Sequence, residues 1–172
     1  VDVGRIPLYL LDTDFECNNQ QDRQITHTLY GGDIENRLKQ EILLGIGGVK
    51  MLQLLDEKPV IYHMNEGHAA FLAIERLSEG VKTNHHTLQA AIEMVRASTL
   101  FTTHTPVPAG HDAFSEDLMR TYFVNYITYL NITWETFMGF GRKDRDNQFE
   151  KFSMSILALK LSQEMNGVSK IH

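Results

Sequence analysis

Three polar clusters in the sequence carry the side chains best suited to chemistry, and each one follows a short apolar segment. The clusters are Asp12-Thr13-Asp14, Asn65-Glu66-Gly67-His68 and His104-Thr105-Pro106. In open α/β sheets, ligands bind outside the carboxyl ends of the strands. If the three apolar segments are parallel strands, Asp12, Asn65, His68 and His104 lie together at one edge of the sheet.

The clusters offer carboxylates, an amide, imidazoles and hydroxyls, with little positive charge. This set suits a neutral polyhydroxylated ligand better than a phosphate. Simpler interpretations stay open, because Asp12 is a common turn former and Asn65 is an ordinary residue for a turn before a helix. His68 can likewise be a half-buried structural histidine. His104 is harder to explain in this way, since a strand that ends at two prolines presents its last residues outward.

Motifs of several other chemistries are missing. Gly45-Ile46-Gly47-Gly48 lies late in a helical pattern rather than between a strand and a helix, so it is not a dinucleotide-binding fingerprint. There is no Gly-x-Ser-x-Gly elbow and no Walker loop. Cys17 is the only cysteine, which excludes an internal disulfide framework and a cysteine-based zinc site and fits a reducing cytoplasm.

The composition narrows the class of protein further. The 172 residues are 42% hydrophobic, enough for the packed core of one domain or of part of a larger one. Sixteen basic against 22 acidic residues give a net charge of −6, which argues against a general binder of nucleic acid or anionic membranes. No apolar run approaches the roughly 20 residues of a membrane helix. The ends at Val1 and His172 lead us to expect a piece of a longer protein.

Short apolar strands alternate with longer helical periods, which is the pattern of a parallel α/β sheet. The predicted strands span residues 6–11, 59–64 and 100–103, with a fourth beginning within 168–171; the predicted helices span residues 33–55, 69–77, 87–98, 115–130, 134–140 and 153–165. The helix over 33–55 begins at the N-cap Asp33 and contains three glycines near its middle. Glycines are costly there, so we expect either a kink or a close approach by another part of the chain.

Five stretches of the sequence resemble the α-glucan (glycogen/maltodextrin) phosphorylases in their shorter bacterial and archaeal form. They are residues 65–71 and 102–112, and then residues 8–14, residues 29–33 with 37–41, and residues 166–172. The stretches occur in the family's order and span nearly the whole chain. The resemblance implies an α/β fold, an incomplete Rossmann-like parallel sheet with flanking helices that is part of a two-domain GT-B glycosyltransferase. Residues 1–172 would form a single segment, the later part of the amino-terminal Rossmann-like domain.

The resemblance also implies an enzyme. Glucan phosphorylases cleave the terminal α-1,4 bond of glycogen or maltodextrin with inorganic phosphate and release glucose 1-phosphate. Their cofactor is pyridoxal phosphate, whose lysine lies in a Gly-Thr-Gly-Asn-Met-Lys-like segment that this sequence does not contain. We therefore expect the isolated chain to bind no cofactor and to be inactive. The implied partners are α-1,4-glucan, inorganic phosphate, the remaining parts of the same enzyme and further copies in a homo-oligomer, but neither nucleic acid nor membrane.

The resemblance assigns substrate binding to Asp12, Thr13, Asn65, Glu66 and His68. The first two match a gate loop beside the sugar, and the last three match a motif that lines the active-site cleft. His104 matches the histidine that contacts the glucosyl unit at the cleavage point, partly through its main-chain carbonyl, whose fixed dipole would stabilise developing positive charge. Two alternatives stay open: a non-catalytic carbohydrate-binding or interaction module derived from the same fold, and the donor-free half of a related glycan synthase.

Overall fold

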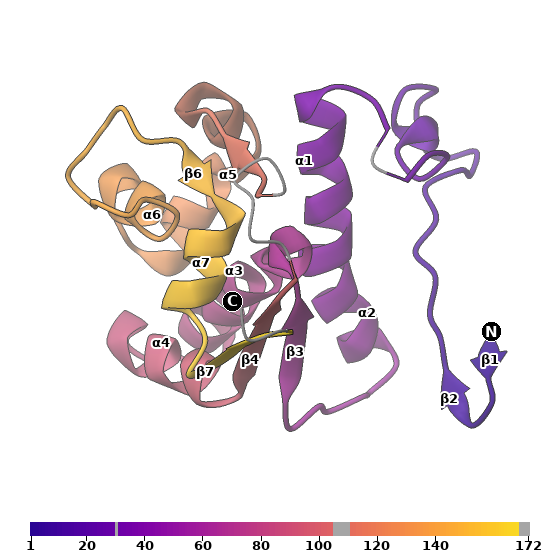
Figure 1. Ribbon diagram of the computed structural model, residues 1–172, viewed down its shortest axis with the longest axis horizontal. Helices are drawn as coiled ribbons and strands as arrows, with labels where there is room; N and C mark the ends of the chain where they lie inside the picture. Colours follow the sequence, from indigo (N-terminus) through magenta and orange to yellow (C-terminus); the bar gives the residue numbers. More distant parts are fainter. Residues whose placement is uncertain (30, 105–110, 169–172) are drawn as a thin grey trace.

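The computed structural model describes residues 1–29, 31–104 and 111–168. Its centre is a three-stranded parallel sheet in the order β3-β4-β7, formed by β3 (Tyr62–Asn65), β4 (Thr99–Thr103) and β7 (Glu164–Gly167). Helices flank the sheet, with the long helix that contains α1 and α2 beyond β3 on one side and α4 to α7 toward the other (Figure 1). The expectation of an α/β fold with a parallel sheet and flanking helices is confirmed.

The register brings the carboxyl ends of the strands to one edge. Asn65 pairs with Thr102, and Thr103 pairs with Gly167. Strand β7 begins at Glu164, earlier than the fourth predicted strand within 168–171, and the helix α7 (Met154–Lys160) is correspondingly shorter than the predicted span of 153–165. The N–H of Gln163 donates to the carbonyls of Arg96 and Thr99, which draws the chain toward β4 instead of continuing the helix.

The predicted first strand, residues 6–11, does not belong to the parallel sheet. Residues Ile6–Pro7 form β2 and pair antiparallel with β1 (Asp2–Val3) in a small hairpin, which turns at Gly4 with a φ of 64°. Pro7 lacks an N–H donor and so cannot occupy a central strand. The following residues run along the outside of the long helix, away from the sheet (Figure 1).

The predicted helix over 33–55 is one continuous run in three parts: α1 (Ile34–Ile42), the π-helical turn η2 (Leu43–Gly47) and α2 (Gly48–Leu54). Asp33 caps it by accepting a hydrogen bond from Asn36 N at 2.8 Å. A Cβ on Gly45 would lie 2.8 Å from the main-chain nitrogen of Leu72, at the start of α3 (Phe71–Ser78). The expectation of a close approach at these glycines is confirmed, and the helix widens into a π turn there.

The remaining elements complete the core. They are η1 (Asp22–Gln24), η3 (Gly67–Ala69), η4 (Glu79–Thr83), α4 (Leu88–Ala97), α5 (Glu116–Leu130), α6 (Trp134–Gly139) and the antiparallel pair β5 (Ala113–Phe114) and β6 (Phe152–Ser153). Phe71, Phe123, Phe137 and Phe152 are fully buried, and successive rings lie 4.6, 5.4 and 5.7 Å apart. The aromatic core thus joins α3 to α5, α6 and β6. No helix in the described part of the chain is both long and apolar enough to span a membrane.

Candidate functional site

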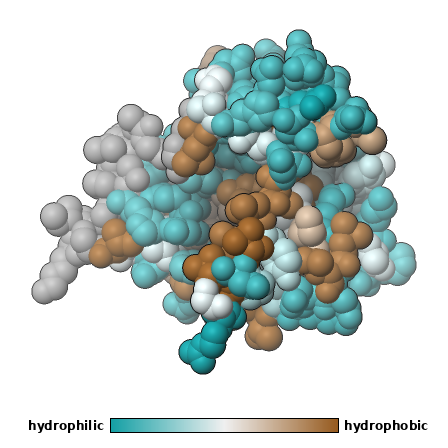
Figure 2. Space-filling model, turned by 90° about the vertical axis from the view of Figure 1, so that its right-hand side faces the viewer, coloured by the Kyte–Doolittle hydropathy of each residue, from teal (hydrophilic) through white to brown (hydrophobic). Residues whose placement is uncertain are grey.

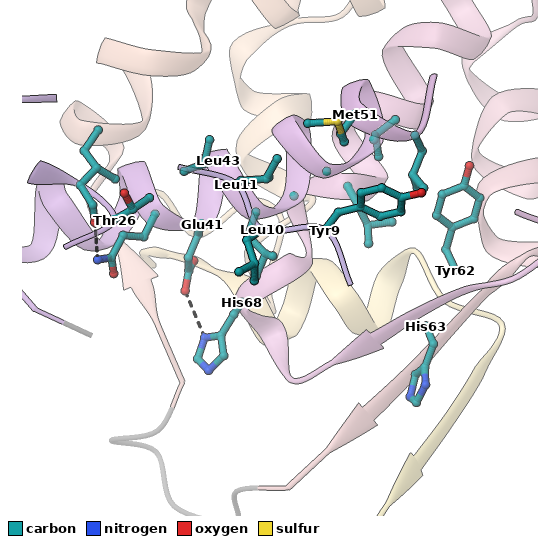
Figure 3. Close-up of a pocket in the computed structure, with 18 of the residues that line it drawn as sticks. Tyr9, Leu10, Leu11, Thr26, Glu41, Leu43, Met51, Tyr62, His63 and His68 are labelled. Atoms are coloured by element: carbon teal, nitrogen blue, oxygen red, sulfur yellow. Dashed lines mark hydrogen bonds and ion pairs between the residues drawn. The ribbon is translucent and has the colours of Figure 1, made fainter. Parts of the chain in front are cut away.

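A pocket of about 750 Å³ lies between the N-terminal segment, the long helix and the edge strand β3. Its wall is mainly apolar, with Leu10, Leu44 and Tyr62 among the lining residues, and Arg37, Glu41 and His68 also line it. Figure 2 shows apolar side chains gathered on this face of the molecule. Figure 3 shows Glu41 and His68 pointing toward one another. The pocket therefore combines a broad apolar surface with a compact group of ionisable side chains.

Asn65, Glu66 and His104 come together at the carboxyl edge of the sheet. Asn65 ends β3 beside Thr102, and Glu66 N donates to the carbonyl of Thr102 at 2.9 Å. The Glu66 side chain accepts a hydrogen bond from the main-chain N–H of His104 through Oε1. The side chains of Asn65 and His104 face solvent, where a ligand can reach them. Thr105, Pro106 and Pro108, which end the predicted strand, lie outside the described residues.

A chain of polar side chains crosses the sheet just below this edge. His63 Nε2 lies 2.7 Å from Thr102 Oγ1, and the Thr102 hydroxyl donates to Asn166 Oδ1 at 2.6 Å. Each residue comes from a different strand, so the three strands are joined by side chains as well as by main-chain bonds. This link gives the site edge a rigid base.

The ionisable group beside the pocket contains Arg37, Glu41, His68 and Asp112. Arg37 donates to Asp112 Oδ2 through Nε at 3.1 Å and through Nη2 at 2.8 Å. Arg37 Nη2 also lies 3.2 Å from Glu41 Oε1 and 2.5 Å from His68 Nδ1. His68 Nδ1 in turn lies 3.2 Å from Asp112 Oδ2 and 3.3 Å from Glu41 Oε1. The group ties α1 to the turn after β3 and to the residues that precede β5.

The environment separates the pKa values of the two carboxyl groups. Burial raises the pKa of Glu41, which is 1% exposed, from 4.5 to about 8. Burial alone would also raise the pKa of Asp112, but hydrogen bonds from His68, Glu41 and Arg37 hold it well below its usual range. Near neutral pH, Glu41 is therefore largely protonated and Asp112 carries the negative charge.

Hydrogen bonds to Asp112 and Glu41 raise the pKa of His68 from 6.5 to about 9. Burial and the positive charge of Arg37 lower the pKa of His68, but the hydrogen bonds to the two carboxyl groups outweigh both effects. A protonated His68 and a charged Arg37 face one ionised carboxylate. The group as a whole thus presents donors and modest positive charge to the pocket.

Glu41, His68 and Asp112 offer ligand atoms that all lie within 4.8 Å of one another, a spacing that a metal ion could use. Arg37 Nη2 already contacts all three side chains. The guanidinium therefore supplies the positive charge that a bound cation would bring, and a metal would have to displace it. The geometry describes an arginine-centred ion-pair network rather than a metal centre.

Asp12 and Thr13 are not at the predicted sheet edge, because their segment is not a strand of the parallel sheet. Asp12 Oδ1 accepts from Asp14 N at 3.0 Å and from the Thr26 hydroxyl at 2.8 Å, the pattern of a self-contained turn. Thr13 is buried, and its N–H donates to Thr26 Oγ1 at 3.2 Å. Thr26 lines the pocket, so the turn adjoins the pocket from the side opposite the sheet. The expectation that Asp12 follows a strand of the parallel sheet, and so lies at the edge of that sheet, is wrong.

Sequence reasoning missed Arg37, Glu41 and Asp112 as site residues. All three lie within stretches that carry the family resemblance, and Arg37 and Glu41 are four residues apart on one helix face. A glutamate in a helix is usually exposed, yet the side chain of Glu41 is buried. The informative signal was an ion pair spaced for one helical face within the strongest predicted helix.

Comparisons with known proteins agree with the sequence motifs. No family model matches the chain. It is 41% identical over 172 residues to the maltodextrin phosphorylase of Thermococcus litoralis, which covers 100% of the chain and 20% of that protein. It is 42% identical over 181 residues to the glycogen phosphorylase of Mycobacterium tuberculosis, covering 99% of the chain and 21% of the relative. For the glycogen phosphorylase of Aquifex aeolicus the identity is 34% over 172 residues, with 100% and 25% covered.

The chain thus spans only about a fifth to a quarter of the length of these relatives. The match nevertheless extends along the whole chain, through each of the stretches that carry the sequence resemblance. The resemblance is therefore confirmed: this chain is homologous over its full length to a segment of the glycogen and maltodextrin phosphorylases.

Proposed function

We propose that the chain is part of an α-1,4-glucan phosphorylase and contributes part of its glucosyl-binding site. The reaction is phosphorolysis, in which inorganic phosphate cleaves the terminal α-1,4 bond and glucose 1-phosphate leaves. Whole-chain identity to relatives named as phosphorylases supports this proposal. The same identity disfavours a separate carbohydrate-binding or interaction module as the function.

The fold proposal follows from the same relationship. Residues 1–172 would be the later part of the amino-terminal Rossmann-like domain of a two-domain GT-B enzyme. A small parallel sheet with flanking helices is what such a segment requires. The other parts of the enzyme, and further copies in a homo-oligomer, would be its partners, and the single cysteine fits a cytoplasmic location.

The observation that carries the site proposal is the meeting of Asn65, Glu66 and His104 at the carboxyl edge of β3 and β4. In this proposal His104 contacts the glucosyl unit with its side chain and its main-chain carbonyl, and Asn65 supplies an amide for sugar hydroxyls. A carbonyl held by the sheet aims its dipole without having to reorganise when charge develops. His68 acts beside them from the ion-pair network, and Asp12 and Thr13 would border the sugar from the turn that adjoins the pocket.

The proposed enzyme would use pyridoxal phosphate, whose phosphate group supplies an acid/base partner for the substrate phosphate. The residues that the structure describes do not place a lysine where it could attach pyridoxal phosphate at this site. No lysine in the described part of the chain lines the pocket, and Lys160 donates to the carbonyls of Gly139 at 2.7 Å and Arg142 at 2.5 Å. Those bonds make Lys160 a structural residue, so this chain's share of the reaction is to bind and orient the sugar.

The test is phosphorolysis by the protein that contains this chain, measured as glucose 1-phosphate formed from maltodextrin and inorganic phosphate. His104→Ala should lower kcat and kcat/KM together by roughly 1–3 kcal/mol in activation free energy, because it removes a contact made in the transition state. The matched control is His85→Ala, an exposed histidine that precedes α4. Absence of glucose 1-phosphate with the unmutated protein would refute the proposal, as would equal kinetics for the two variants.

A further inference from the structure

Glu66 has a backbone conformation that is costly for any residue with a side chain. Its φ is 65° and its ψ is 176°, a region that is occupied almost only by glycine. The residue is 9% exposed. Gly67, which would adopt these angles freely, is the next residue, yet the unusual angles fall on Glu66. A strained and buried glutamate directly after a strand requires an explanation in what its side chain does.

The hydrogen-bond ladder between β3 and β4 provides one. In a parallel ladder, a residue donates its N–H to one residue of the neighbouring strand and accepts, through its carbonyl, from the N–H two positions further along. Glu66 N donates to the carbonyl of Thr102, so a regular ladder would have the Glu66 carbonyl accept from His104 N. In the structure, the acceptor for His104 N is the side-chain oxygen Oε1 of Glu66.

The two features explain each other. The positive φ of Glu66 turns the main chain out of the strand and into η3, which begins at Gly67. That turn takes the carbonyl out of its regular place in the ladder, and the carboxylate takes the vacated place. The second oxygen, Oε2, is buried and has no hydrogen-bond partner among the residues that the structure describes. The bond to His104 is therefore the contact that offsets the burial of this carboxylate in the described structure.

We propose that Glu66 is a positioning residue for His104: its carboxylate replaces its own main-chain carbonyl as the last acceptor of the β3–β4 ladder and fixes the main chain of His104 at the sheet edge. What His104 contacts rests on the function proposed above, whereas the bond from His104 N to Glu66 does not. The role depends on an acceptor oxygen at the end of the side chain and not on the backbone strain, so the two can be separated by substitution.

Three variants separate them. Glu66→Gln keeps an acceptor oxygen, Glu66→Ala removes the acceptor but keeps a Cβ at the strained position, and Glu66→Gly removes both the acceptor and the strain. Hydrogen–deuterium exchange of the His104 amide, resolved by mass spectrometry with electron-transfer fragmentation, should be roughly tenfold faster in the alanine and glycine variants. It should stay near the original rate in the glutamine variant. The amide of Tyr62, which donates to Ser98 at the opposite end of the ladder, is the internal control.

Kinetics and stability complete the test. In the proposed phosphorolysis, the alanine and glycine variants should lose roughly tenfold in kcat, and glutamine should restore most of it. The glycine variant should melt no lower than the alanine variant, because glycine relieves the strain. Unchanged exchange of the His104 amide in the alanine variant would overturn the proposal even if His104→Ala impaired catalysis. Faster exchange in a protein that forms no glucose 1-phosphate would support the positioning role and refute the proposed function instead.

Discussion

Replacing Gly45 with alanine tests the physical account of the π turn in the long helix. A Cβ at this position would lie 2.8 Å from Leu72 N and 2.9 Å from Phe71 Cβ. The start of α3 would have to move, because one of these neighbours is main chain rather than a flexible side chain. Overpacking of this kind costs about 1–3 kcal/mol. Alanine recovers up to about 1 kcal/mol of helix propensity. At the upper end of the overpacking range, we therefore expect the free energy of unfolding to fall by about 2 kcal/mol.

Gly48→Ala is the matched control in the same helix. A Cβ at Gly48 would meet nothing within 4 Å, so the propensity gain of up to about 1 kcal/mol should appear without a packing cost. The two substitutions should therefore change the free energy of unfolding in opposite directions. Urea denaturation gives both values, and equal m-values would show that the unfolded states are comparable. If Gly45→Ala stabilised the protein as much as Gly48→Ala, the close approach would not explain the glycine.

Three further predictions concern the ion-pair network and the exposed apolar face. The free energy of unfolding should fall between pH 6 and pH 9, because the pKa values of Glu41 (about 8) and His68 (about 9) in the folded protein lie above their ordinary values of 4.5 and 6.5. The folded state therefore binds more protons than the unfolded state in this range of pH. Glu41→Gln should flatten this fall, and parallel pH profiles of urea-derived stability would contradict the assignment. Arg37→Met should lower the free energy of unfolding by about 3 kcal/mol, because it removes the guanidinium that pairs with the ionised carboxylate of Asp112 and contacts the buried Glu41. Lys39→Met should lower it by less than about 1 kcal/mol, because its partner Asp22 is more exposed. Equal effects of the two variants in thermal unfolding would count against the network. The isolated chain should self-associate through the exposed edge of the parallel sheet and through the apolar wall of the pocket beside β3. A single monomeric species in sedimentation velocity at all concentrations would exclude this.

The elements that the sequence predicts well are those with a local cause. The predicted helix over 115–130 is α5, which Ser115 caps by accepting a hydrogen bond from Leu118 N, and two acidic residues follow this cap. Strand β4 lies between a capped helix and a polar cluster, and its bounds differ from the prediction by one residue. Periodicity and capping residues act over a few positions, so they can be read without knowledge of the tertiary fold.

The errors have non-local causes. An apolar run such as Ile6 to Leu11 favours an extended chain, but the run does not state which partner it pairs with, and here the partner is Asp2–Val3. The burial of Glu41 depends on the tertiary fold, in which Arg37 contacts both Glu41 and Asp112, a residue 75 positions further along the chain than Arg37. The meeting of Asn65 with His104 was predictable, because parallel strands bring their carboxyl ends to one edge. The replacement of a main-chain acceptor by the Glu66 side chain depends on a single torsion angle that composition and periodicity do not encode.

The order of the strands in the sheet determines which strand edge is unpaired while the chain is being synthesised. Side chains joining β3 to β4 are 39 residues apart in the chain, whereas those joining β4 to β7 are 64 apart. The ribosome synthesises β3 and β4 well before β7. The edge of β4 that later pairs with β7 therefore has unpaired main-chain groups while α5, α6 and α7 are synthesised. Longer loops also close more slowly. The nascent chain therefore passes through a period in which its central strand is an open edge, and that period is when a chaperone or another nascent chain has the best opportunity to bind it.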